Sequence, residues 1–265
     1  MKTRILAMII LTIAALCLLL GLTIGRNKTS NNDNIMKAET VDSTKVAERV
    51  LNLIILDESG SMSGLEKVSV DGVNETIQTI KSSYEQLPEQ KQLMTFVTFS
   101  DMYGKPYRKR FELADISTVD TYQLSEYQPG GTTPLYDTMG DTLTELEKVA
   151  TENDIVLVTI ITDGYENSSR EYDAEKIREL VKRLDEKDWV FTYIGANQDA
   201  ILEARKIGIN NAMNYDADED GTREMWEKEK RSRTFFMQKA RVGTMKSRLK
   251  SDYFINEEND TRNDK

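Results

Sequence analysis

Histidine is absent from the 265-residue sequence, and Cys17 is its single cysteine. Without histidine, the chain lacks the usual base of a Ser-His or Cys-His nucleophile pair and a common ligand of zinc. A single cysteine allows no internal disulfide, so cysteine content gives no indication of the compartment. The formal net charge of −10 gives no reason to expect nucleic acid as a partner. Several classes of chemistry are therefore excluded before any motif is considered.

The composition is that of a globular protein, with 39% hydrophobic and 30% charged residues. A long apolar run, residues 5–24, follows Lys2 and Arg4 and is long enough to span a bilayer. The basic residues before this run predict a single-pass membrane protein with a cytoplasmic N-terminus and an extracytoplasmic domain. Cleavage after Gly25, which would give a secreted protein, is the alternative. The expected organisation is a signal anchor (1–25), a flexible polar linker (26–47), a folded domain (48–245) and a charged, disordered tail (246–265).

An apolar stretch over residues 50–56 ends in a short loop of oxygen-bearing side chains. The stretch shows little alternation, which is typical of a strand buried on both faces of a parallel sheet. Asp57, Ser59 and Ser61 follow on alternate positions, at the end of the strand where open α/β sheets bind ligands. Oxygen donors at this spacing suit a small hard cation such as Mg²⁺. The alternative is that they only cap the helix that follows.

Further polar loops are predicted at the same edge of the sheet. The sequence QPGGTTPLYD offers the hydroxyls of Thr132 and Thr133 just before a helix, and its simpler interpretation is a glycine turn with an N-cap. No Gly-Lys-Ser/Thr follows, so this loop is not a P-loop. A second continuous apolar run, residues 154–162, ends at Asp163. We therefore expect Asp163 beside Asp57 at the carboxyl ends of the strands.

Strands and helices alternate along the chain, which predicts a doubly wound, mostly parallel α/β sheet with helices on both faces. The predicted strands cover residues 50–56, 93–99, 107–113, 122–127, 154–162, 189–194 and 212–215. Of these, 107–113 and 122–127 are expected at an edge of the sheet. The predicted helices cover residues 65–87, 134–149, 174–184, 199–207 and 221–249.

Over about residues 50–240, the chain resembles the von Willebrand factor A domain family. DESGS matches the D-x-S-x-S loop of that family, GGTTPLYD is similar to the threonine loop of its bacterial members, and TDG matches its distal aspartate loop. The resemblance implies a Rossmann-like fold and a metal-ion-dependent adhesion site that holds Mg²⁺, with Mn²⁺ or Ca²⁺ as possible substitutes.

The resemblance also implies the ligands of this site. They are five oxygen-bearing residues: Asp57, Ser59, Ser61, Thr132 and Asp163. The serines are expected to bind the ion directly, the threonine directly or through water, and the aspartates mainly through water. Thr133 takes the place of Thr132 if the register of the loop differs by one residue.

Such a site suits protein binding better than catalysis. Because only two carboxylates serve the ion, an Asp or Glu of a partner protein can complete its shell with a charge-assisted bond. We therefore expect a protein-binding and adhesion module that is not an enzyme. One alternative is a membrane-tethered accessory domain that recruits a substrate or an ATPase partner. Metal-assisted hydrolysis, the other, would need Glu58 or Glu166 as a general base, since no histidine exists.

A second acidic motif follows the last predicted strand. Asp216, Asp218, Asp220 and Glu227 match the spacing of an EF-hand loop and would bind Ca²⁺ as a second site. The alternative is that these residues cap the next helix, where negative charge is favourable.

Overall fold

The computed structural model describes residues 48–102, 104–196, 200–241 and 253–254. The predicted anchor and linker, and nearly all of the predicted tail, lie outside the described residues. Within the described part of the chain, none of the helices combines the length and the apolar character needed to span a bilayer.

The described residues form a six-stranded sheet with the order β3-β2-β1-β4-β5-β6, in which β3 runs antiparallel to β2 and the other pairs are parallel. The strands are β1 (Arg49–Asp57), β2 (Lys91–Phe99), β3 (Tyr107–Asp115), β4 (Ile155–Thr162), β5 (Val190–Ala196) and β6 (Asn211–Tyr215). The helices are α2 (Glu66–Gln86), α3 (Leu135–Glu147), α4 (Ala174–Asp185), α5 (Ala200–Lys206) and α6 (Glu219–Arg241). Short 3₁₀ turns are η1 (Gly60–Met62), η2 (Ile116–Thr118) and η3 (Leu124–Glu126). The predicted mostly parallel α/β fold is confirmed.

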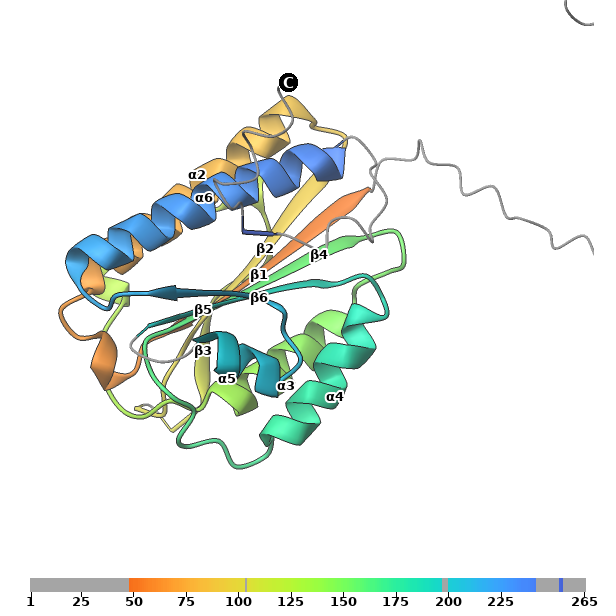
Figure 1. The fold of residues 1–265 in the computed structure, drawn as a ribbon. Coiled ribbons are helices and arrows are strands. Elements are labelled where there is room, and N and C mark those ends of the chain that lie inside the picture. Colours follow the sequence, from red (N-terminus) through yellow and green to blue (C-terminus); the bar gives the residue numbers. More distant parts are fainter. Residues whose placement is uncertain (1–47, 103, 197–199, 242–252, 255–265) are drawn as a thin grey trace, which may run out of the picture. The chain divides into compact units, whose positions relative to one another are not determined.

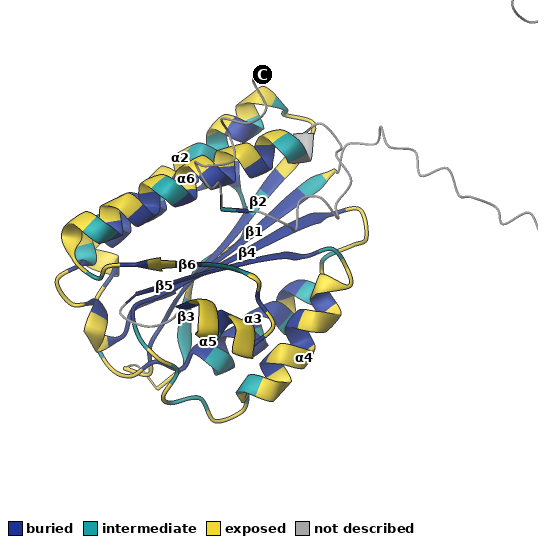
Figure 2. Cartoon of the chain, viewed as in Figure 1, coloured by how far each residue is buried: buried dark blue, intermediate teal, exposed yellow. Residues whose placement is uncertain are grey.

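Helices cover both faces of the sheet, with α2 and α6 on one face and α3, α4 and α5 on the other (Figure 1). Alternate residues of β1 enter the two cores: Ile54 packs in the core with α2 and α6, and Leu53 and Ile55 in the core with α3 and α4. The central strands are accordingly buried along their length (Figure 2). Burial on both faces explains why the sequence of β1 lacks alternation.

The segment over residues 122–127, predicted as an edge strand, is instead the turn η3 and its flanks. The amide of Gln123 donates to Glu126 Oε2 at 2.9 Å in a reciprocal capping arrangement. Such local bonds from side chains to the backbone compete with strand pairing and favour a turn. The prediction failed because the alternation of apolar and polar residues over Tyr122–Leu124 does not reveal these bonds.

A buried charged residue fixes α6 on the sheet. The side chain of Arg233 is fully buried and donates to Glu229 Oε1 at 2.9 Å, to Asn52 Oδ1 of β1 at 3.0 Å and to Thr159 Oγ1 of β4 at 2.8 Å. The hydroxyl of Tyr253 donates to the same Glu229 oxygen at 2.9 Å. This network sets the position of α6 over the two central strands.

Candidate metal centre

Asp57 ends β1, and each of its carboxylate oxygens is held by a hydrogen bond. The residue is fully buried. The amide of Ser59 donates to its Oδ1 at 2.7 Å, and the hydroxyl of Thr162, the last residue of β4, donates to its Oδ2 at 2.6 Å. The hydroxyl of Tyr127 donates to its backbone carbonyl at 2.5 Å. Asp57 is therefore fixed by hydrogen bonds from one strand and two loops.

The serines of the same loop connect Asp57 to the end of β4. Ser59 Oγ and Ser61 Oγ lie 3.1 Å apart, and Ser61 Oγ donates to Asp163 Oδ1 at 2.6 Å. Because β1 and β4 are adjacent and parallel, Leu56 is paired with Ile161 and the two strand ends lie side by side. The structure thus brings four of the five predicted ligands together.

The two threonines of the Gly-Gly-Thr-Thr loop differ in environment. Thr133 is buried and Thr132 is exposed. A β-carbon placed on Gly164 would lie 3.5 Å from both Ser61 Oγ and Thr133 Oγ1, and 4.0 Å from Asp57 Oδ2. Three oxygens, two from the segment that ends β1 and one from the Gly-Gly-Thr-Thr loop, therefore converge beside Gly164. The hydroxyl that joins this group is that of Thr133, the alternative position, whereas the amide of Thr132 donates to Asp101 Oδ1 at 2.7 Å.

The two aspartates of the site have raised pKa values because they are buried. Burial raises the pKa of Asp57 to about 7, against the lowering effect of hydrogen bonds from Thr162 and Ser59. Burial also raises the pKa of Asp163, against a hydrogen bond from Ser61. Among the residues that the structure describes, neither carboxylate pairs with a lysine or arginine. Both carboxylates would therefore gain from a bound cation.

Glu58 and Glu166, the candidates for a general base, are engaged in structural contacts. Glu58 is buried and pairs with Arg108 and Arg110 of β3, and its Oε1 accepts the amide of Gln128 at 2.7 Å. Glu166 Oε1 accepts the amides of Ser168 and Ser169 at 2.8 Å and 2.7 Å, and its Oε2 accepts the amide of Tyr136 at 2.8 Å. Both carboxylates hold backbone amides of the loops around the site.

Three residues that the sequence analysis did not single out also position these loops. Asp101 accepts the amide of Thr132, Asn167 Oδ1 accepts the amide of Thr133 at 2.9 Å, and Asp137 accepts the amides of residues 170–172 at 2.8 Å each. Aspartate and asparagine in loops and at helix N-termini commonly bond to backbone amides, which is the only signal that the sequence offered. It does not indicate which amide is bound.

The acidic motif after β6 does not form a cluster in the structure. Asp218 Oδ1 accepts the amide of Gly221 at 2.8 Å, as a helix-capping residue does, and Asp220 pairs with Arg223 at 2.7 Å within α6. Glu227 lies further along the same helix. In the described parts of the chain, no group of three or more Asp, Glu, His or Cys side chains could hold a metal ion. In the structure, Asp218 and Asp220 therefore make the contacts that the helix-capping alternative expects, and calcium binding by this motif stays a prediction.

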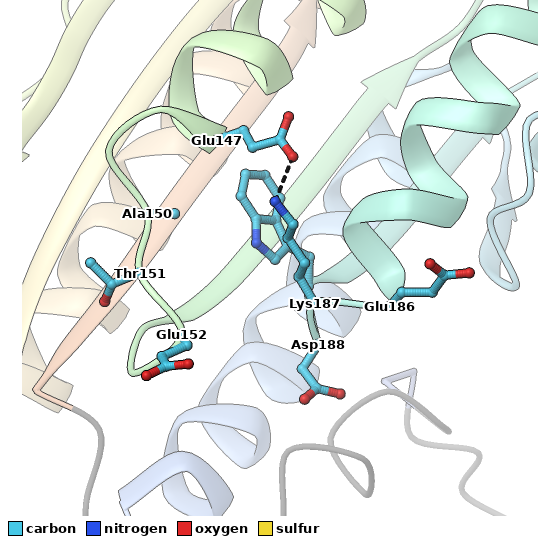
Figure 3. A pocket seen from close by; sticks show the side chains of 8 residues that line it. Glu147, Ala150, Thr151, Glu152, Glu186, Lys187 and Asp188 are labelled. Carbon is cyan, nitrogen blue, oxygen red and sulfur yellow. Dashed lines mark hydrogen bonds and ion pairs between the residues drawn. The ribbon is translucent and has the colours of Figure 1, made fainter.

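A cavity of about 410 Å³ lies at the amino ends of β4 and β5, at the end of the sheet opposite the candidate site. It is lined by residues that precede β4 and β5, among them Glu152 and Trp189. Glu147 accepts from Lys187 Nζ at 2.8 Å across this cavity (Figure 3) and from Arg183 Nη2 at 2.8 Å. The negative charge of the cavity lining is thus partly neutralised by the ion pairs of Glu147.

The fold and the oxygen-lined site place the protein among doubly wound α/β domains that carry a polar site at the carboxyl ends of their central strands. A family model for the von Willebrand factor type A domain matches residues 53–227. The chain belongs to this family, whose domains are generally protein-interaction modules.

Solved structures with a similar fold come from distant proteins. The manganese-loaded TRAP protein of Plasmodium vivax is 20% identical, with a TM-score of 0.45 over 66% of this chain and 72% of that chain. The VWA domain of SpRpn10 is 13% identical, with a TM-score of 0.48 over 68% and 94%. The pilus adhesin SpaC of Lactobacillus rhamnosus GG is 13% identical, with a TM-score of 0.54 over 72% and 31%. Of these three, SpaC has a TM-score above 0.5, and its likeness shows the fold alone. No curated protein matches the chain.

Proposed function

We propose that the site at the carboxyl ends of β1 and β4 holds a divalent cation, Mg²⁺ first and Mn²⁺ or Ca²⁺ as substitutes, and that this ion binds a carboxylate of a partner protein. The observation that carries the proposal is the convergence of Ser61 Oγ, Thr133 Oγ1 and Asp57 Oδ2 around one point beside Gly164. Ser59 and Asp163 complete the set through their contacts with Ser61. Hydroxyl and carboxylate oxygens are the donors that Mg²⁺ prefers.

The charge of the donor set supports a binding role. Two carboxylates and three hydroxyls neutralise a divalent ion but leave some of its coordination positions to water. A partner's carboxylate can replace one of these waters and form a bond in which both groups are charged. Burial raises the pKa of Asp57, and a bound cation would favour its charged form.

Exposed apolar side chains beside the site favour a protein as the partner. Met102 is 44% exposed and lies against Gly130, and Tyr165 is 54% exposed and follows Gly164 directly. Large exposed apolar residues around a polar centre are typical of protein interfaces.

We do not propose an enzymatic function. A hydrolytic role would need a base free to accept a proton from metal-bound water. Glu58 is neutralised by two arginines, and Glu166 accepts backbone amides with both of its oxygens. These contacts indicate that both glutamates hold the backbone around the site in place.

The proposal is tested by metal titration of the full-length chain. Mn²⁺ binding, followed by electron paramagnetic resonance, should be strong in the wild type and should weaken at least about 10-fold in the Ser59→Ala, Ser61→Ala double variant. Water-proton relaxation should then show that added acetate displaces water from the bound Mn²⁺. Ser125→Ala, in η3, serves as the matched control. Equal Mn²⁺ affinity in the wild type and the double variant would contradict the proposal.

For the location of the protein, we propose that residues 5–24 anchor the chain in a membrane and that the folded domain lies on the extracytoplasmic side. The apolar run and the preceding Lys2 and Arg4 support this orientation. Reporter fusions at the C-terminus should be active only with an extracytoplasmic reporter. Activity of a cytoplasmic reporter would contradict the proposed orientation.

A further inference from the structure

Two adjacent threonines are available to the proposed metal site, and separate contacts hold them in different places. Asn167 holds Thr133 through both of its backbone polar groups: its Oδ1 accepts the amide of Thr133 at 2.9 Å, and its own amide donates to the carbonyl of Thr133 at 3.2 Å. With both backbone groups engaged by one residue, Thr133 cannot slide along the loop without losing two hydrogen bonds. Its hydroxyl lies 3.5 Å from the position that a β-carbon on Gly164 would take, a point that Ser61 Oγ and Asp57 Oδ2 also approach.

Thr132 is held away from this point by Asp101, which follows β2. The amide of Thr132 donates to Asp101 Oδ1 at 2.7 Å. Hydrogen bonding by Thr132, first through its amide, lowers the pKa of Asp101. The side chain of Thr132 is exposed to solvent, whereas that of Thr133 is buried.

Gly131 makes this arrangement possible. Its φ of +74° is a conformation that favours glycine, and a β-carbon there would lie 2.5 Å from Asp101 Oδ1 and 2.9 Å from the amide nitrogen of Met102. Any side chain at this position would push Asp101 away from Thr132. Gly131 therefore allows the turn of this loop. Asp101 then binds the backbone at Thr132, and Asn167 binds the backbone at Thr133.

We propose that Asn167 is a positioning residue that selects Thr133, rather than Thr132, as the threonine ligand of the metal. This inference rests on the proposed metal site. Asn167 lies four positions after Asp163 on the loop that follows β4. The loop that supplies one aspartate of the site thus also sets the register of the loop that supplies the threonine. The amides of residues 170–172, bound by Asp137, fix this loop to α3.

The first experiment compares the two threonines in the full-length chain, kept in a mild non-ionic detergent, with Mn²⁺ as the probe. Thr133→Val should weaken Mn²⁺ binding at least about 10-fold, and Thr132→Val should leave it within about threefold of the wild type. The two variants are matched because they make the same change at neighbouring positions. The opposite pattern would overturn the inference.

The second experiment asks whether Asn167 acts through Thr133. Asn167→Ala should weaken Mn²⁺ binding about 10- to 100-fold in the wild type and in Thr132→Val, and should have no further effect in Thr133→Val. Asn167→Asp keeps an oxygen that accepts the amide of Thr133, so it should bind Mn²⁺ at least as well as the wild type. A general loss of structure would not produce this dependence on the background.

The outcomes separate this inference from the proposed function. If Ser61→Ala and Thr133→Val both leave Mn²⁺ binding unchanged, the metal site itself is wrong. If these two variants weaken binding but Asn167→Ala has no effect, or has an equal effect in both threonine backgrounds, the role of Asn167 is wrong. Urea unfolding in EDTA checks that each variant folds, and Asn167→Ser replaces Asn167→Ala in every comparison if the alanine variant does not.

Discussion

Gly164 is the residue whose replacement tests the space between the donor oxygens most directly. A β-carbon at this position would be in ordinary contact, 3.5 Å, with Ser61 Oγ and Thr133 Oγ1, so Gly164→Ala should fold. The added methyl group would exclude water from one side of a bound ion, which needs a complete oxygen shell. We expect Mn²⁺ affinity to fall about 10-fold or more, while the free energy of unfolding in EDTA changes by less than about 1 kcal/mol. Unchanged affinity in a folded variant would show that the ion does not bind beside Gly164.

At this same scale, most of the candidate site could be predicted from sequence. Asp57, Ser59 and Ser61 follow a strand that is recognisable from its apolar run, and Asp163 follows another, so topology alone places them at one edge. Their role in metal binding stays a prediction. The choice between the two threonines could not be predicted, because it depends on Asp101 and Asn167, which lie 31 and 34 positions away in the chain.

At the scale of the elements, the packing of α6 on the sheet depends on a buried ion pair between Arg233 and Glu229. Arg233 bonds to Glu229, Asn52 and Thr159 in the interior of the protein, and Arg233→Met would leave the Glu229 carboxylate buried without its cation. We expect this variant to lower the free energy of unfolding by about 3–5 kcal/mol, measured by urea denaturation. Lys230→Met, one turn away on the exposed face, should change it by less than about 0.5 kcal/mol. A loss for Arg233→Met no larger than that of the control would contradict this account.

Element prediction from the sequence succeeded where burial decides the structure and failed where local hydrogen bonds decide it. The central strands were recognisable because burial on both faces imposes continuous apolar runs. The turn η3 was mistaken for a strand because Gln123 and Glu126 cap each other. The acidic motif matched a calcium loop in spacing, but Asp218 caps α6 and Asp220 pairs with Arg223. Residue spacing therefore predicts which side chains could bind a metal ion, but not which groups those side chains contact in the fold.

For the molecule as a whole, the apolar residues beside the site should determine which carboxylates are bound. Met102 and Tyr165 are exposed next to the glycines of two of the site's loops. In Mg²⁺, the immobilised full-length chain should select acidic peptides with large apolar neighbours from a displayed random library. The Met102→Ser, Tyr165→Ser variant should still select acidic peptides but lose the apolar preference, with unchanged Mn²⁺ affinity. The same apolar preference in both proteins would contradict a role for these side chains.

Changes at the amino ends of the strands should leave the proposed metal site at their carboxyl ends unaffected. Glu147, at the amino ends, allows this to be tested. Its pKa is lowered to about 2, chiefly by the hydrogen bond from Arg183 and further by Lys187. Because the pKa in the folded state lies below the unfolded value of about 4.3, the ion pairs stabilise the protein above that pH, and this stabilisation is lost as the pH falls toward the folded-state value.

Glu147→Gln should therefore lower the free energy of unfolding at pH 7 by about 1 kcal/mol, since both cationic partners are partly exposed to solvent. In urea titrations across pH, the difference from the wild type should shrink between about pH 5 and about pH 2. Glu89→Gln, at an exposed glutamate, is the matched control. Mn²⁺ affinity at pH 7 should be the same in all three proteins, because the cavity and the donor oxygens lie at opposite ends of the strands. A weaker Mn²⁺ affinity in Glu147→Gln alone would show that the two edges are coupled through β4 and β5.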